Sequence, residues 1–366
     1  MVKVVKSLKS DNERLRLEAL LPSLLGRVPF IKITRISNEP LTPRASHHAH
    51  QVAEVIAGDQ NWTLVAEKKR LGHPSEVRTA VLQLQHSLRQ LPKGSAGYGV
   101  VLAPFISEES AKICTEAGVG YADLSGNARL SFDQVFIETR GSDNPLREKR
   151  ETRPLFTLRG TRVLRLLLQG PLRPWKVKDL AEKAGVSLGG VSTVRQQLLA
   201  HEWAVEEKEG FRVTKPGALL DAWAKADDWE KRTEVRNYSV LVTDAEDLAK
   251  RLHSLLGETS HAFTQWFGAG LRHPLASVPL VTAYVKKFPD ELILSEKLLA
   301  RRIDGVGRAR LVVPKDEGVL HLLQTLNQLP VVCDVQLYLD LIHAGLRGDE
   351  AAEELRSWPD FSGGWA

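Results

Sequence analysis

Short polar and cationic side chains between residues 176 and 212 have the chemistry to bind duplex DNA. Hydroxyls, an amide and an arginine can hydrogen-bond to base edges and to phosphates. Five such side chains fall on the predicted outward face of one helix: Ser187, Ser192, Thr193, Arg195 and Gln196. Four cations precede or follow that helix: Lys176, Lys178, Lys208 and Arg212. We expect the first two to flank the DNA backbone and the last two to lie on a β-hairpin, so the predicted partner is double-stranded DNA.

Three predicted helices and a hairpin would position these side chains. Apolar spacing predicts a helix around residues 163–167 that stops at Gly170, a second over 177–184 that ends at Gly185, and a third over 187–201 capped by Ser187. Two β-prone runs, 203–206 and 211–214, flank a turn. This order is typical of a winged helix-turn-helix, whose third helix enters a major groove. The alternative is a module used only for packing or dimerisation.

A second group of residues could take part in metal-dependent hydrolysis. Glu67 and Lys69 stand two positions apart at the end of a predicted strand. Such hydrolysis needs converging carboxylates that hold the metal and a cation that positions water. The pair resembles the E-x-K half of the restriction-endonuclease-like PD-(D/E)XK core, with Asp59 or Glu54 as candidates for the second acid. We expect a degenerate copy of that core with no bound metal. The alternatives are a metal-dependent DNA nuclease using Glu67, Lys69 and Asp59, and a surface strand that merely ends in charges.

Strands and helices alternate on both sides of the predicted DNA-binding stretch, which indicates two α/β domains. In the first, residues 62–66 and 98–103 are predicted strands, 76–91 and 108–117 are predicted helices, and 53–56 are predicted as a helix end. In the second, residues 292–294 are predicted as a strand and 318–326 as a helix. Within the first domain, the Ser125-Gly126-Asn127 turn could donate its amides to Asp123.

Length and composition set the class of protein. A chain of 366 residues is too long for one ordinary core. We therefore predict a restriction-endonuclease-like α/β domain over residues 1–150, a winged helix over 151–218 and a C-terminal α/β domain over 219–366. Two cysteines far apart in sequence indicate a reducing compartment, and no stretch approaches a membrane span, so we expect a cytoplasmic protein without a membrane partner. No Cys/His cluster or phosphate-binding glycine loop is found, so we expect neither metal nor cofactor.

The formal net charge is only +5, but basic residues are concentrated between Arg140 and Arg165, immediately before the predicted winged helix. Attraction to DNA phosphates is one interpretation of this run. A solvated linker face is the other.

Four segments together carry a resemblance to a family. Residues 104–130, 173–194, 334–341 and 347–352 are similar to AbiEi-type antitoxins of type IV toxin–antitoxin systems, and the resemblance spans roughly residues 50 to 355. It implies a transcriptional regulator whose winged helix binds its own promoter. It also implies a C-terminal domain that helps to neutralise a nucleotidyltransferase-like toxin. Winged helices often pair, so a homodimer is expected as well. The simpler members begin with the winged helix, whereas here a whole α/β domain precedes it.

Overall fold

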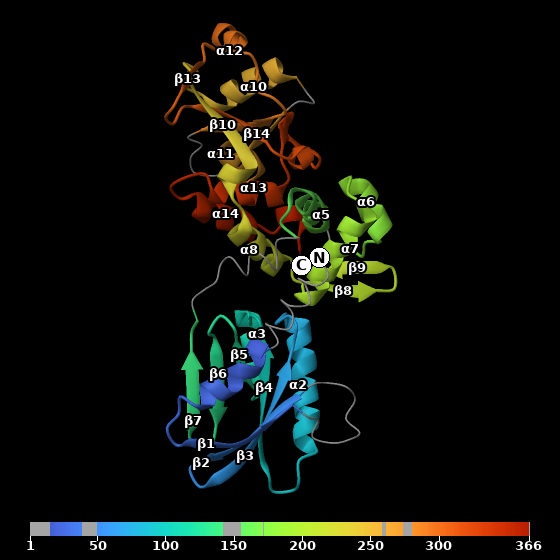
Figure 1. The fold of residues 1–366 in the computed structure, drawn as a ribbon. Coiled ribbons are helices and arrows are strands. Elements are labelled where there is room, and N and C mark those ends of the chain that lie inside the picture. The colour runs from blue at the N-terminus through green and yellow to red at the C-terminus, as the bar shows by residue number, and fades with distance from the viewer. Residues whose placement is uncertain are drawn as a thin grey trace, which may run out of the picture. The chain divides into compact units, whose positions relative to one another are not determined.

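The computed structural model describes residues 15–38, 50–141, 155–170, 172–257, 261–273 and 280–365. The protein is a mixed α/β structure with two compact units. The smaller unit comprises Met1–Lys149 with Ala200–Glu202, and the larger comprises Arg150–Leu199 with Trp203–Ala366 (Figure 1). No helix in the described part of the chain is long and apolar enough to cross a membrane.

The smaller unit is built on one sheet, in which the described residues contribute seven strands in their sequence order. The strands are β1 (Ile31–Ser37), β2 (His50–Ala57), β3 (Gln60–Lys68), β4 (Ala96–Ala103), β5 (Gly120–Asp123), β6 (Ala128–Phe132) and β7 (Val135–Thr139). Strand β4 runs parallel to β3 and β5, and the other neighbours are antiparallel. Parallel pairs need a crossover, and α2 (Pro74–Arg89) and α3 (Glu108–Glu116) supply the two crossovers.

Both faces of this sheet carry apolar side chains and are covered by helices. Alternate side chains of a strand point to opposite faces, so one strand contributes to two core clusters. On β3, Leu64 and Ala66 belong to one core cluster together with Leu21 from the helix over residues 15–25. Val65 belongs to a second cluster with apolar residues of α2 and α3, including Val77. The unit therefore has three layers, helix, sheet and helices, as the blue-to-green part of Figure 1 shows.

The structure corrects one prediction in this unit and confirms another. Residues 53–56 are not a helix end but lie within β2. Ala53 and Val55 are buried there and Glu54 is exposed, a period of two that a short apolar run does not separate from a helical one. The turn after β5 is as predicted: Asp123 accepts hydrogen bonds from the backbone N–H groups of Ser125 and Asn127 at 2.8 and 3.0 Å.

The larger unit contains a second sheet, to which the described residues again contribute seven strands. In spatial order they are β13 (Arg301–Ile303), β10 (Thr233–Ser239), β14 (Ala309–Pro314), β12 (Val281–Val285), β11 (His261–Thr264), β16 (Leu329–Val331) and β15 (Gln324–Leu326). The β12–β14 and β11–β16 pairs are parallel, and the others are antiparallel.

Helices of two kinds complete the larger unit. Those before the sheet are α5 (Leu158–Leu168), α6 (Val177–Ala184) and α7 (Leu188–Ala200), followed by a hairpin of β8 (Ala204–Glu207) and β9 (Gly210–Val213). We call residues 155–213 the three-helix-and-hairpin segment. The remaining helices are α8 (Pro216–Ala226), α9 (Trp229–Arg232), α10 (Ala245–Leu256), α11 (Gln265–Arg272), α12 (Glu291–Leu298), α13 (Asp334–Ile342) and α14 (Gly348–Ser357), with single 3₁₀ turns at Glu317–Leu320 and Phe361–Gly363.

Two predictions for the larger unit are wrong. Residues 292–294 lie in α12 rather than in a strand, because the Asp290 side chain accepts from the Leu292 N–H and starts a helix. Residues 318–326 are a 3₁₀ turn followed by β15 rather than one helix. The chain reverses after β15 at Asn327 and Gln328, both of which have positive φ.

The three-helix-and-hairpin segment shares one hydrophobic core with the C-terminal sheet. A single cluster of buried side chains contains Leu164 of α5, Val194 of α7 and Leu337 of α13, and it crosses the boundary predicted at residues 218 and 219. Arg165 of α5 is 4 % exposed and donates from Nε to Gln336 Oε1 of α13 at 2.8 Å. Burial lowers the pKa of this guanidinium.

Candidate nucleic-acid interface

The turn between α6 and α7 has the geometry that the sequence predicts. Gly185 takes the left-handed conformation, with φ of 61° and ψ of 38°, and ends α6. Two residues later, Ser187 Oγ accepts from the Gly190 N–H at 3.2 Å and caps α7. The prediction of a glycine turn followed by a serine cap is therefore confirmed.

Helix α7 has one buried and one open side. Val191, Val194 and Leu198 are buried, at helical spacing. On the other side, Ser187, Thr193 and Gln196 are exposed, and Ser192 and Arg195 are half-buried. None of the five polar residues of the predicted interface is therefore buried: four lie on α7, and Ser187 directly precedes it.

The first turn of α7 contains a glycine that nothing inside the protein requires. A Cβ placed on Gly189 would have no heavy atom within 4 Å, and the residue is exposed with an ordinary helical φ. Glycine in a helix destabilises it by roughly 0.5–1 kcal/mol relative to alanine. An external group that approaches the backbone of this turn would explain the absence of a side chain.

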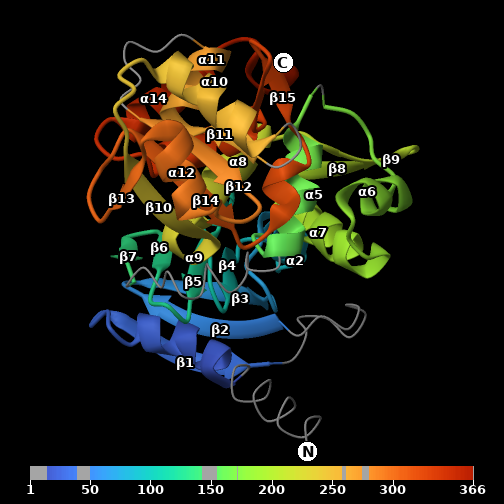
Figure 2. The same ribbon diagram turned by 90° about the horizontal axis from the view of Figure 1, so that it is seen from above.

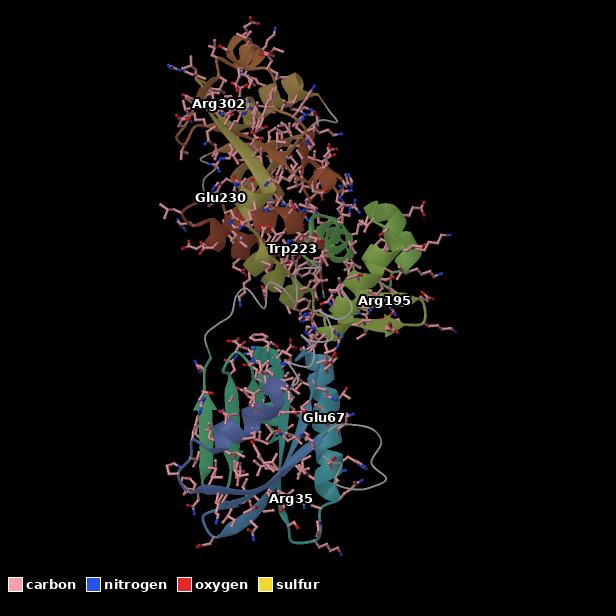
Figure 3. All side chains as sticks on the ribbon, in the orientation of Figure 1. Arg35, Glu67, Arg195, Trp223, Glu230 and Arg302 are labelled. Carbon is pink, nitrogen blue, oxygen red and sulfur yellow. The ribbon has the colours of Figure 1, made fainter. Side chains whose placement is uncertain are left out.

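Both arginines of the predicted interface are engaged by acids of the hairpin. Arg195 on α7 is ion-paired with Glu206 on β8. Arg212 on β9 donates from Nε to Glu207 Oε1 at 2.6 Å. In Figure 3, Arg195 lies among the yellow-green elements of this segment. No local sequence pattern predicts these pairs, because they depend on how the hairpin folds against α7.

The three lysines of the predicted interface, Lys176, Lys178 and Lys208, are exposed. Lys176 directly precedes α6, and Lys208 lies at the hairpin tip. The backbones of Trp175 and Phe211 exchange two hydrogen bonds, of 2.8 and 3.1 Å, which hold the start of α6 beside that tip. Figure 2 shows α6, α7 and the hairpin together at one side of the larger unit.

Two further cations, which are not among the predicted site residues, lie beside these lysines. Arg173 and Lys183 both line a surface hollow together with Lys176 and Lys208. The available signal was the position of Arg173 two residues before Trp175 in an extended segment, since such residues share a face.

The smaller unit brings together part of the predicted metal chemistry. At the end of β3, Lys69 Nζ lies 2.9 Å from Glu67 Oε1 and 2.6 Å from Gln83 Oε1 of α2. Glu67 is 2 % exposed, and Figure 3 shows it beside α2. A buried acid, a lysine and an amide therefore meet on the α2 side of the sheet.

The proposed second acids do not reach Glu67, and this part of the prediction is wrong. Asp59 lies in the turn before β3, so roughly 25 Å of strand separates it from Glu67. Glu54 of β2 pairs with Thr63 of β3, which lies four residues before Glu67. The Glu54 Oε1 atom lies 3.9 Å from Arg35 Nη1. Among the described residues, no group of three or more His, Cys, Asp or Glu side chains could hold a metal ion. His47 and His48, two neighbouring histidines that could be considered as metal ligands, lie outside the described residues.

Comparisons with known proteins add little to this geometry. No family model matches the chain, and no curated protein matches it. Among solved structures, the chain is similar to one described as "Structure of EndoMS in apo form", with 16% sequence identity and a TM-score of 0.22. The match covers 31% of this chain and 45% of that one, so it spans less than half of the other protein. A likeness with so low a TM-score carries no argument about fold or function.

Proposed function

We propose that the protein is a DNA-binding transcriptional regulator and that its three-helix-and-hairpin segment acts as a winged helix. In this proposal α7 enters a major groove, and the hairpin and the start of α6 contact the flanking backbone. The observation that carries it is the division of α7 into a buried apolar side and an open side with hydroxyls, an amide and the bare Gly189. Such a side matches the donors and acceptors of base edges.

The resemblance to AbiEi-type antitoxins supplies the more specific form of the proposal. The protein would repress its own promoter, and its C-terminal sheet domain would take part in neutralising a nucleotidyltransferase-like toxin. A homodimer would place two copies of α7 on two half-sites. The uncovered polar side of α7 supports the DNA-binding part of this proposal, which can be tested without the toxin.

The test is binding of the full-length protein to duplex DNA from upstream of its own reading frame, measured by fluorescence anisotropy at several salt concentrations. The logarithm of affinity should fall with the logarithm of salt, with a slope of about 0.9 for each phosphate contacted. The Ser192→Ala/Gln196→Ala variant, which leaves the Ser187 cap in place, should bind this DNA at least tenfold more weakly, because each base contact contributes roughly 1–3 kcal/mol. It should bind unrelated duplex as the unaltered protein does.

A matched control uses exposed neutral residues on other helices of the same unit. Ser254 of α10 and Ser295 of α12 are exposed, and Ser254→Ala/Ser295→Ala, which also changes no charge, should leave binding of the upstream DNA unchanged. Equal affinity of the α7 variant and this control would contradict the placement of α7 in the groove.

A further inference from the structure

A hollow of about 670 Å³ lies between the start of α6 and the hairpin tip. Its volume is in the range of small-molecule sites, roughly 300–1,000 Å³. The residues that line it are Arg173, Pro174, Trp175, Lys176, Asp179, Lys183, Lys208 and Glu209. Cations outnumber carboxylates in this lining, so the hollow has a net positive charge.

The wall of the hollow is firmly built. Trp175 is 8 % exposed, and its backbone is held by the two hydrogen bonds to Phe211. The Arg173 guanidinium lies over the indole with its Cζ 4.0 Å from the ring centroid, and Lys183 Nζ lies 5.5 Å from it. Contacts of this kind hold a cation in place without neutralising it. The indole therefore fixes two positive groups at the hollow.

The cations of the hollow have no acidic partner within the part of the chain that the structure describes. Within the described residues, no carboxylate oxygen lies within 4.0 Å of a side-chain nitrogen of Arg173, Lys176, Lys183 or Lys208. By contrast, Arg195 and Arg212 of the neighbouring elements are both paired with glutamates. Like charges gathered without counter-charges repel one another. An anion bound between them would remove that repulsion.

We propose that this hollow binds a phosphate group, either from the backbone of duplex DNA or from a free phosphorylated small molecule. Guanidinium and ammonium groups are the usual protein partners of phosphate oxygens. The DNA source rests on the function proposed above, whereas the small-molecule source does not. Asp179 and Glu209 limit the affinity, because they would lie near the bound anion.

The first experiment titrates full-length protein with pyrophosphate in an isothermal calorimeter. Saturable binding should weaken at least tenfold in Arg173→Gln/Lys183→Gln, and Lys250→Gln/Arg251→Gln on α10 is the control with the same change in charge. Both residues of the test variant are exposed, and equal thermal unfolding of the two variants checks the fold. Asp179→Asn/Glu209→Gln should bind pyrophosphate several-fold more tightly than the unaltered protein.

The second experiment measures duplex DNA binding by the same proteins against salt. If the hollow holds a backbone phosphate, the slope of the test variant should be smaller by about 0.9 for each phosphate lost, and pyrophosphate should compete with DNA. If it holds a free ligand, the slope stays unchanged and only pyrophosphate binding is lost. Absence of DNA binding by the unaltered protein would reject the proposed function, while the pyrophosphate titration would still test the hollow. The inference is overturned if the test variant and its control agree in both experiments.

Discussion

At the scale of single residues, acids on the hairpin oppose the DNA contacts proposed for the arginines. Glu206 forms an ion pair with Arg195, and Glu207 forms one with Arg212. An exposed ion pair of this kind contributes only about 0.2–1 kcal/mol, so DNA phosphates can compete for the arginine. The carboxylates nevertheless repel the DNA backbone, and their presence sets an upper limit on affinity.

Replacing the acid that pairs with Arg195 should therefore strengthen binding. We expect Glu206→Gln to raise the affinity for duplex DNA about three- to tenfold, because Arg195 becomes available and one negative charge disappears from the interface. Glu246→Gln on α10 removes the same charge from an exposed ion pair elsewhere and should leave the affinity unchanged. Anisotropy titrations at one salt concentration compare the two. Weaker binding by Glu206→Gln would mean that the ion pair positions Arg195 productively.

The bare first turn of α7 leads to a prediction in which stability and binding change in opposite directions. Gly189→Ala should stabilise the larger unit by roughly 0.5–1 kcal/mol, because alanine is the better helix former and open space surrounds the position. The same methyl group should weaken DNA binding at least tenfold if DNA approaches this backbone closely. Denaturant unfolding and anisotropy measure the two effects. Unchanged DNA binding would place the groove contact elsewhere on α7.

A buried histidine should make the stability of the larger unit depend on pH. His261 of β11 is 1 % exposed, and burial lowers its pKa from 6.5 to about 4. The unfolded chain binds the proton more readily, so stability is fully present above about pH 6.5 and is lost as pH falls towards 4. The loss should be on the order of 3 kcal/mol. Denaturant unfolding of the protein and of His261→Leu at pH 7 and pH 4 tests this, and the variant should lose less.

At the scale of elements, signals that are local in sequence led to correct predictions, and those that depend on pairing did not. Gly185 and Ser187 mark the boundary between α6 and α7 through their own backbone and side-chain preferences. By contrast, residues 53–56 were misassigned because a short apolar run is buried equally well in a strand or a helix. The pairing of Arg195 with Glu206 depends on where the hairpin packs, which no local pattern encodes.

Variants of Glu67 and Lys69, which meet between β3 and α2, distinguish a nuclease function of this pair from a purely structural role. Lys69→Met should destabilise the smaller unit by about 3 kcal/mol, because it removes the cation beside a buried carboxylate. Glu67→Gln/Lys69→Met should recover part of that loss, since burying a neutral amide costs less than burying a carboxylate. Denaturant unfolding measures both variants. Cleavage of duplex DNA with magnesium or manganese, abolished by Glu67→Gln, would instead establish the nuclease function.

At the scale of the whole molecule, we expect the proposed DNA-binding segment to need the C-terminal sheet domain for its folding, because the two share one core. The last backbone carbonyl of α5, that of Leu168, accepts hydrogen bonds from residues near the C-terminus of the chain. Ser362 Oγ and Trp365 Nε1 donate to it at 2.6 and 2.9 Å. Arg165 reaches Gln336 of α13 within the shared core. The sequence could not reveal this dependence, because the helix and hairpin signals are complete within residues 155–213 and the partners lie more than 150 positions away.

Two fragments test this dependence. A fragment of residues 151–218, the stretch that the sequence predicts as a winged helix, should lack cooperative unfolding, because buried groups on α5 would lose their partners. A fragment of residues 150–366 should retain both cooperative unfolding and DNA binding. Circular dichroism melts and amide proton dispersion distinguish the two states. A folded 151–218 fragment that binds DNA would contradict this expectation. It would show that the shared core adds stability without being needed for the fold or for DNA binding.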